Sequence, residues 1–208
     1  INLGSIARLC ANFEVDELRL VGNSCDQDDP EAKKMALKGK SFLERIRKFK
    51  TLPEALSDCH RVIATCGRID HGDIPLESTE EGLSWLMQND HFKPIAIVFG
   101  RESRGLTNHE LQLAHKVITI NTSPRYPSLN LSHSVGIVLY EASKYKPDNR
   151  KSLSIDSHIL SSPKQLNDLI IDAQEILLEI GFLFEHTAKA RMSKVKAILN
   201  RAEIKSKE

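Results

Sequence analysis

The sequence predicts an α/β protein built on a parallel sheet. Short apolar segments bounded by turn residues alternate with segments whose apolar residues recur at helical spacing. The short segments are apolar on both faces, as are strands of a sheet that helices cover on both sides. Four strands are expected, at 18–21 (LRLV), 61–65 (RVIAT), 95–99 (IAIVF) and 117–120 (VITI).

Apolar spacing and capping residues predict the helices between these strands. The first helix has apolar residues at i, i+3, i+4 and i+7, namely Ile6, Leu9, Cys10 and Phe13. A short helix follows Pro53, and another covers about 80–88. Two pairs have capping-box spacing, in which a hydroxyl and a carboxylate satisfy the first turn of a helix: Thr51 with Glu54, and Thr107 with Glu110.

A strand should feed the first helix of such a sheet, but the chain begins at Ile1 almost directly with a helix. We therefore expect the N-terminus of this sequence to be truncated.

The C-terminal part predicts a separate helical hairpin. Residues 146–164 are polar, with five serines and a proline near each end, and are expected to form a linker. Helical spacing follows over 165–184 with a break at Gly181, and a basic helix comes next. The predicted organisation is a domain over 1–145, a linker over 146–164 and a helical extension over 165–208.

The composition is that of an ordinary folded protein, because 40% of the 208 residues are hydrophobic and 27% are charged. No apolar run approaches the roughly 18 residues that span a bilayer, and no leader opens the chain, so a cytoplasmic protein is expected. The cysteines (10, 25, 59 and 66) form no CxxC pair, and no HExxH occurs. We expect neither a disulfide framework nor a metal site, and Cys10 and Cys66 as buried thiols.

The charge is unevenly distributed, although the net charge is only +1. Residues 31–50 hold eight lysines or arginines against two glutamates, and residues 189–207 hold seven against one acidic residue. These two basic segments indicate a polyanionic partner, with two solvated lysine-rich faces as the alternative.

Three loops carry residues suited to ligand binding. In NLGSIAR (2–8), the helix mouth at Asn2 and Gly4 offers N–H groups to a phosphate and Arg8 lies one turn inside, although Asn2 could equally be a cap and Arg8 a surface cation. In FGRESRGL (99–106), Gly100 and Gly105 permit tight turns. Glu102 lies between two arginines and is expected to pair with one of them. A plain strand-to-helix turn is the alternative.

The third loop opens the stretch PRYPSLNLSHSVGIVLYEASKY (124–145). Pro124 and Pro127 restrict its backbone, so it loses little entropy on holding a ligand. On these residues alone, Ser128 is expected to be an N-cap and Asn130 a first-turn residue. One buried helical face follows, formed by Leu131, Val135, Val138, Ala142 and Tyr145.

The three loops together, in this order, resemble the three motifs of the SpoU (TrmH-like) family of RNA ribose 2′-O-methyltransferases, within the SPOUT superfamily. The resemblance covers about residues 1–145. The segments ATCGR (64–68), TNHEL (107–111) and 177–202 are most similar to the TrmJ branch, which modifies the tRNA anticodon loop at a position of the 32 type.

This resemblance implies a SPOUT-type parallel sheet with a deep C-terminal trefoil knot that includes 124–130, plus a small helical extension. It implies S-adenosylmethionine as the cofactor, tRNA or another structured RNA as the partner, and a homodimer that completes the site across its interface. The implied cofactor-binding residues are Thr65, Cys66, Gly67, Gly100, Arg101, Glu102, Ile120, Ser128 and Leu129. The implied catalytic residues are Arg8, Asn2, Glu102, Ser128 and Asn130.

By the same resemblance, Arg8 lies nearest the target hydroxyl, where we expect it to bind phosphate and stabilise the developing alkoxide, since a guanidinium is a poor base. Asn2 and Glu102 would hold Arg8, and Asn130 would join the first and third motifs. An rRNA methyltransferase of the same family and a catalytically silent RNA-binding module remain alternatives. A nucleotide-binding metabolic enzyme is disfavoured, because neither GxGxxG nor GxxxxGK[ST] occurs.

Overall fold

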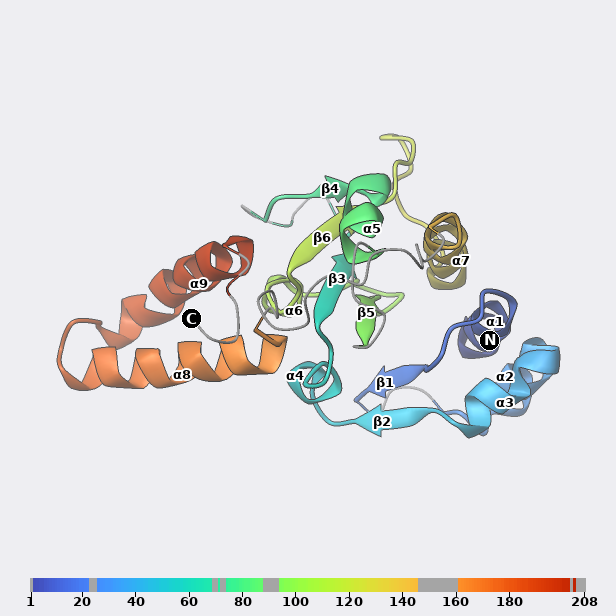
Figure 1. Ribbon diagram of the computed structural model, residues 1–208, viewed down its shortest axis with the longest axis horizontal. Coiled ribbons are helices and arrows are strands. Elements are labelled where there is room, and N and C mark those ends of the chain that lie inside the picture. The colour runs from blue at the N-terminus through green and yellow to red at the C-terminus, as the bar shows by residue number, and fades with distance from the viewer. Residues whose placement is uncertain are drawn as a thin grey trace, which may run out of the picture.

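The strands form two separate parallel sheets (Figure 1). The computed structural model describes residues 2–22, 26–68, 71, 74–87, 94–145, 161–202 and 204, with only the backbone of 200 and 201. One sheet has four strands in the order β4-β6-β3-β5, and the other pairs β1 with β2. The strands are β1 (Arg19–Val21), β2 (Arg47–Phe49), β3 (Arg61–Thr65), β4 (Glu77–Ser78), β5 (Ile95–Val98) and β6 (Lys116–Thr119).

The predicted α/β class with a parallel sheet is confirmed. The strands expected at 61–65, 95–99 and 117–120 are present as β3, β5 and β6, with ends that differ by no more than one residue. The segment expected at 18–21 also forms a strand, β1, but it pairs with β2 outside the main sheet. Neither β2 (RKF) nor β4 (ES) was predicted, because neither contains an apolar run.

Helices of very different length surround the sheets. The longest are α8 and α9, at 17 residues each. The helices are α1 (Asn2–Asn12), α2 (Pro30–Ala36), the 3-10 helix η1 (Leu37–Gly39), α3 (Lys40–Glu44), α4 (Leu52–Ala55), α5 (Thr79–Met87), α6 (Asn108–Leu111), α7 (Leu131–Ala142), α8 (Pro163–Glu179) and α9 (Glu185–Arg201).

The two faces of the four-stranded sheet are both covered. Successive side chains of β3 point to opposite faces. Val62 and Ala64 therefore join one core cluster with Leu111 of α6, while Ile63 joins another with Leu83 of α5 and residues of α7. This explains why the strands are apolar on both faces.

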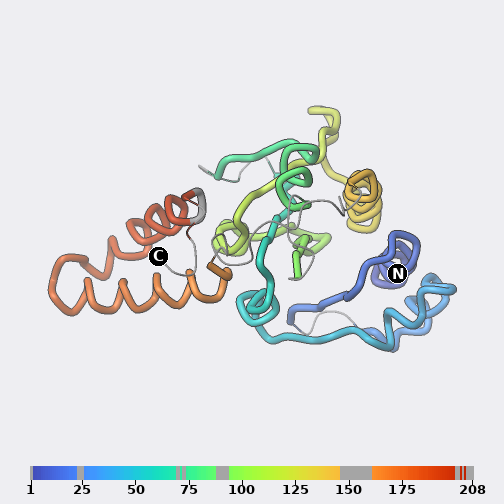
Figure 2. Tube along the Cα trace, viewed as in Figure 1, coloured from blue at the N-terminus to red at the C-terminus, as the bar shows by residue number. Residues whose placement is uncertain are grey.

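Close backbone packing fixes α1. The helix predicted from Ile6, Leu9, Cys10 and Phe13 is confirmed as α1. Its buried residues are Leu3, Gly4, Ala7 and Cys10. Gly4 lies against α2, where an added Cβ would come 2.0 Å from the carbonyl oxygen of Ala32. Glycine is therefore needed at position 4 because α1 packs closely against α2, and not because a ligand approaches the N-terminus of α1. Figure 2 shows α1 lying beside α7, which is far away in sequence.

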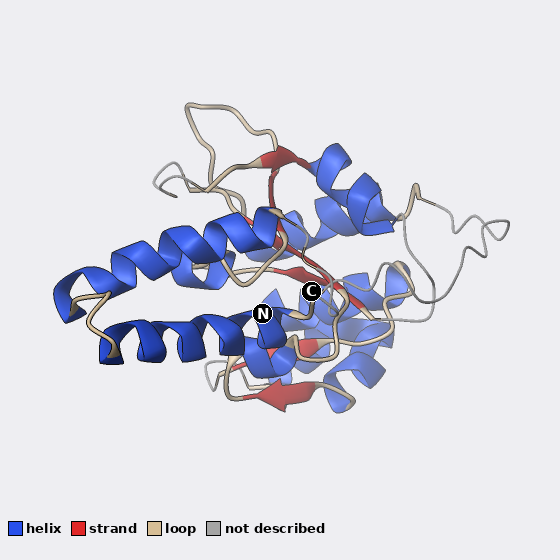
Figure 3. Ribbon diagram, turned by 60° about the vertical axis from the view of Figure 1, so that its left-hand side comes forward, coloured by secondary structure: helices blue, strands red, loops and turns tan. Residues whose placement is uncertain are grey.

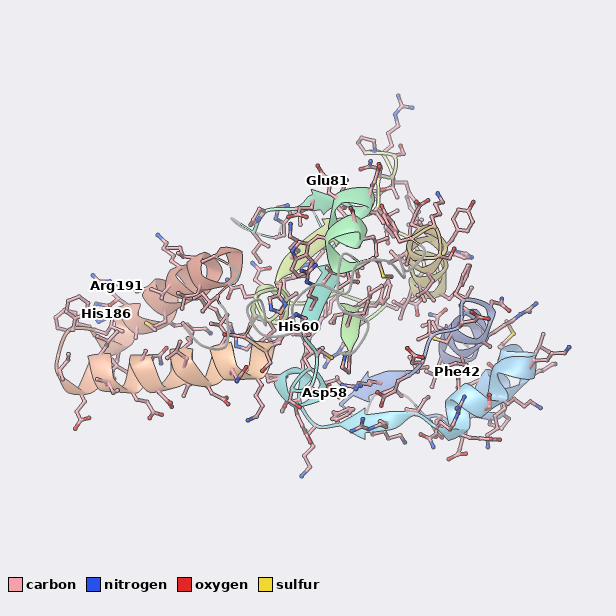
Figure 4. The ribbon with its side chains drawn as sticks, viewed as in Figure 1. Phe42, Asp58, His60, Glu81, His186 and Arg191 are labelled. Carbon is pink, nitrogen blue, oxygen red and sulfur yellow. The ribbon has the colours of Figure 1, made fainter. Side chains whose placement is uncertain are left out.

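Arg19 connects the small sheet to the segment before β3. Its guanidinium donates to the carbonyl oxygen of Ala55 (2.6 Å) and to the Asp58 carboxylate (2.5 Å); Asp58 lies beside α4 (Figure 4). The hydrogen bond from Arg19 lowers the pKa of Asp58 to about 2.

The two predicted capping boxes differ. Thr107 and Glu110 form both reciprocal bonds, as expected. Thr51 accepts from the N–H of Glu54, but the Glu54 carboxylate accepts from the N–H of Lys50 at 3.1 Å and not from Thr51. Only one of the two hydrogen bonds predicted for the capping box of Thr51 and Glu54 is therefore formed.

The C-terminal helices form an antiparallel hairpin that projects from the α6 side of the main sheet (Figure 3). Its own core contains Ile170, Leu183, Ala188 and Met192, and the predicted break at Gly181 is confirmed by a positive φ of 75°. Helix α8 begins at Pro163, and Ser162 is its N-cap. The linker expected at 146–164 therefore includes the first residues of this helix. Its residues 146–160 lie outside the described residues. Among the described helices, none is long and apolar enough to cross a bilayer.

Two glycine substitutions test the packing of α1. In Gly4→Ala, the new methyl group meets the Ala32 backbone, and we expect a loss of about 1–3 kcal/mol in the free energy of unfolding. In Gly136→Ala on α7, the methyl group would lie 3.6 Å from Leu9 side-chain atoms, an ordinary contact. This control should gain about 0.5–1 kcal/mol, because alanine is the better helix former. Urea denaturation followed by circular dichroism measures both, and equal effects would contradict the packing argument.

Candidate active site

A pocket of about 370 Å³ lies at one edge of the main sheet. Strands β3, β5 and β6 are parallel neighbours, so their carboxyl ends meet at the same edge, where ligands of α/β sheets bind. The loops that leave these strands line the pocket. All nine residues expected to bind a cofactor are among its lining: Thr65, Cys66, Gly67, Gly100, Arg101, Glu102, Ile120, Ser128 and Leu129.

The loop after β5 is closed on itself. The N–H of Gly105 donates to the carbonyl oxygen of Arg101 at 2.7 Å, and the same two residues form an isolated bridge. An added Cβ at Gly100 would lie 2.3 Å from the carbonyl carbon of Gly105, and Gly105 has a φ of 67°. Both glycines are therefore required by the turn itself.

The capping box of α6 anchors the far end of this loop. The Glu110 carboxylate accepts from the N–H of Thr107 at 2.7 Å. Burial would raise the pKa of Glu110, but the hydrogen bonds from Thr107 and the nearby Arg101 and Arg104 outweigh burial and lower it.

The side-chain amide of Asn130 joins all three motifs. Its Nδ2 donates to Oδ1 of Asn2 (3.2 Å) and to Oε1 of Glu102 (2.9 Å). Its Oδ1 accepts from the N–H of Ser132 (2.9 Å). A carboxylate can only accept hydrogen bonds, so Glu102 fixes which end of the amide faces it.

Two expectations about this region were wrong. The N-cap of α7 is Asn130 and not Ser128, which lies two residues earlier in the loop. Among the described residues, the Glu102 carboxylate accepts from the neutral amide of Asn130 and forms no ion pair with Arg101 or Arg104.

Arg8 stands apart from the pocket. It is exposed on α1, and it is not among the residues that line the pocket. Within the described part of one chain it forms no hydrogen bond or ion pair, so the expected contacts with Asn2 and Glu102 are not made there and stay a prediction for a dimer. Arg8 is six positions after Asn2, which is about 9 Å along a helix. Its backbone is nevertheless fixed, because an added Cβ at Gly39 would lie 2.8 Å from the Cα of Arg8.

A second pocket, of about 660 Å³, adjoins the first. The two share Glu102, Ser128 and Leu129. Of the other lining residues, Asn130 was predicted as a site residue, whereas four were not: Thr122, Ser123, Tyr126 and His133. The sequence did show Tyr126 between two prolines, but only as part of a rigid loop.

The thiols lie in the interior. Cys10, Cys59 and Cys66 are buried and free, which confirms the expectation for Cys10 and Cys66; Cys25 lies outside the described residues. Burial raises the pKa of Cys10 to about 11 and that of Cys59 to about 12, so neither is a thiolate at neutral pH. Among the described side chains, no cluster of three or more His, Cys, Asp or Glu could hold a metal ion.

Comparisons with known proteins agree on one family. The model of the SpoU rRNA Methylase family matches residues 1–140. The chain is 34% identical to the tRNA (cytidine-2′-O-)-methyltransferase TrmJ of Methanocaldococcus jannaschii, over 100% of this chain and 89% of that protein.

Solved structures are similar as well. The crystal structure of TrmJ from Z. mobilis ZM4 has a TM-score of 0.84 and 28% identity, and the match covers 99% of this chain and 88% of that one. The AdoMet-bound rRNA methyltransferase from Sinorhizobium meliloti has a TM-score of 0.54 and 25% identity, over 74% of this chain and 52% of that one.

Two substitutions separate the capping role of Asn130 from its joining role. Asn130→Ala removes the cap of α7, and we expect a loss of about 1 kcal/mol in the free energy of unfolding. Asn130→Ser keeps an oxygen for the N–H of Ser132 without turning a charge toward Glu102, so its loss should be less than about half of that. Urea denaturation measures both, and an equal loss in the two variants would contradict the assigned cap.

Proposed function

The chain belongs to the SpoU rRNA Methylase family, and on that premise we propose that it transfers a methyl group from S-adenosylmethionine to the ribose 2′-hydroxyl of a tRNA nucleotide. The observation that carries this proposal is the Asn130 amide, which holds Asn2 and Glu102 beside the pocket at the sheet edge. The likeness to a tRNA methyltransferase over the whole chain, hairpin included, favours tRNA over rRNA.

The pocket of about 370 Å³ suits the cofactor. Backbone from three loops surrounds it, with apolar side chains such as Ile120 and Leu129 beside hydroxyls such as Ser128, a mixture typical of small-molecule sites. The similarity to an AdoMet-bound methyltransferase supports this choice. When bound, S-adenosylmethionine supplies a methyl group activated by its sulfonium charge, so the reaction needs alignment and loss of one proton, and no metal ion.

The protein's contribution is then positioning and electrostatics. Glu102 lines both pockets, at the boundary where the ribose must approach, and Asn130, which donates to it, lines the larger one. We assign Arg8 to the phosphate next to the target ribose, where its positive charge stabilises the developing alkoxide while that phosphate of the RNA accepts the hydroxyl proton. A guanidinium stays protonated at neutral pH, so Arg8 is not the base.

A homodimer would bring Arg8 to the site. In one chain Arg8 is exposed and away from the pocket lining, so the proposal gives the Arg8 of each subunit to the pocket of the other. Exposed apolar side chains on the neighbouring α7 support an interface there, since Ile137 is 38% and Tyr140 56% exposed.

Three finer features complete the proposal. The chain threads through a deep trefoil knot that includes residues 124–130, which lie against the loop after β5 at the shared pocket wall. Residues 1–145 form the methyltransferase domain, with the hairpin as an extension. The target is a pyrimidine nucleotide of the anticodon loop, at a position of the 32 type, in cytoplasmic tRNA.

The basic segments would contact phosphates. All eight cations of residues 31–50 are exposed. On α9, Lys189, Arg191 and Lys194 are exposed, and Figure 4 shows Arg191 on the outer side of the hairpin. Lys196 does not belong to this surface, because it is buried, donates to Oδ1 of Asn167 at 2.8 Å, and has a pKa lowered by burial.

Substitutions of Arg8 test the assigned chemistry. Arg8→Ala should lower kcat/KM by about 10²–10³, because a positive charge at the developing alkoxide is lost. Arg8→Lys should retain part of the rate, since the charge remains. Transfer of labelled methyl groups from S-adenosylmethionine to tRNA from cells that lack the protein measures both.

The matched control is Lys164→Ala, which removes an exposed cation paired with Asp168 on α8 and should leave kcat/KM unchanged. If Arg8→Ala were as active as the parent chain, Arg8 would have no part in the reaction.

A further inference from the structure

The pocket of about 660 Å³ lies where a substrate base must go, if the proposed function holds. The 2′-hydroxyl that accepts the methyl group is on C2′, and the base is attached to the adjacent carbon, C1′. A ribose at the boundary formed by Glu102, Ser128 and Leu129 therefore carries its base into a space next to the cofactor pocket. The second pocket shares these three residues and is that space.

The side chains that line this pocket match the chemistry of a nucleobase. Tyr126 and Leu129 are its large apolar side chains, whereas the hydroxyls of Thr122, Ser123 and Ser128 are polar. A nucleobase likewise has two apolar faces and a hydrogen-bonding edge. Such a surface binds bases mainly by stacking, with little dependence on their identity.

A rigid loop keeps the side chain of Tyr126 exposed to solvent. The residue is 77% exposed, the largest value among the exposed large apolar residues described. Its own N–H donates to the carbonyl oxygen of Ser123 at 3.0 Å, and the Thr122 hydroxyl donates to the carbonyl oxygen of Pro127 at 3.2 Å. The ring is thus presented before any ligand arrives, so stacking on it orders little of the chain.

The neighbouring residues suit a nucleotide as well. Arg125 is exposed beside Tyr126, where it can meet a phosphate. His133, in the first turn of α7, also lines the pocket and is exposed. An aromatic ring next to a cation at the mouth of a pocket is a common arrangement at single-stranded nucleic-acid sites.

We propose that Tyr126 is the stacking platform for the base of the methylated nucleotide, which leaves the stack of its loop to enter this pocket. The base is recognised by its aromatic face, so cytosine and uracil are both accepted. This role rests on the proposed function and adds a substrate-binding residue to it.

The test compares the parent chain and two Tyr126 variants on two RNAs. One RNA is a tRNA transcript that the parent chain methylates, and the other carries an abasic ribonucleotide, with its 2′-hydroxyl intact, at the methylated position. On the complete RNA, Tyr126→Ala should lower kcat/KM by about 5- to 100-fold, and Tyr126→Phe by less than about 3-fold, because the ring remains. On the abasic RNA, parent and Tyr126→Ala should be equal, since no base is left to stack.

Controls keep the outcomes distinct. Phe182→Ala removes a ring that is 67% exposed at the hairpin turn, and should leave kcat/KM unchanged. Calorimetry should give the same affinity for S-adenosylmethionine in Tyr126→Ala as in the parent. Equal kcat/KM for Tyr126→Ala and the parent on complete RNA, or an equally large loss on abasic RNA, overturns the stacking role and leaves the methyltransferase standing. A parent chain that methylates no RNA overturns the proposed function and the stacking role together.

Discussion

One amide group holds the candidate site together. The Asn130 side chain uses its NH₂ group for Asn2 and Glu102 and its oxygen for the start of α7. These partners come from the first helix, the loop after β5 and the last helix of the methyltransferase part. Asparagine alone among the side chains of its size offers donors and an acceptor in one plane. Because the same group caps α7, the start of this helix and the geometry of the site are fixed together.

The partners of this amide are themselves held by close packing. Helix α1 is clamped by Gly4 against Ala32 and by Gly39 against the backbone of Ala7 and Arg8, so Asn2 has a defined position. The loop that carries Glu102 is closed by the bridge between Arg101 and Gly105. Rigid backbone thus fixes the positions from which the polar side chains of the site extend. Such support allows a site to act by alignment of its reactants.

The sequence predicted those parts whose pattern is local. Strands β3, β5 and β6 follow from short apolar runs, and the Thr107 cap follows from the spacing to Glu110. The nine residues expected to bind the cofactor, which line the pocket of about 370 Å³, came from the family resemblance, because their convergence depends on the order of parallel strands. The cap of α7 was misassigned, since Ser128 and Asn130 are both good caps two residues apart, and only the contact with Glu102 and Asn2 decides between them. The partners of Arg8 could not be predicted for another reason: within the described residues of a single chain, Arg8 has none.

Binding of S-adenosylmethionine to the parent chain and to Asn130→Asp, compared by calorimetry, tests the central role of this amide most directly. The substitution keeps the helix cap but turns a carboxylate toward Glu102, so the loop that carries Glu102 is pushed away from the pocket. The account predicts that the parent binds the cofactor and that the variant binds it at least about tenfold more weakly, a difference of about 1.4 kcal/mol. Equal affinities would contradict it, because the pocket would then be held by something other than the Asn130 amide.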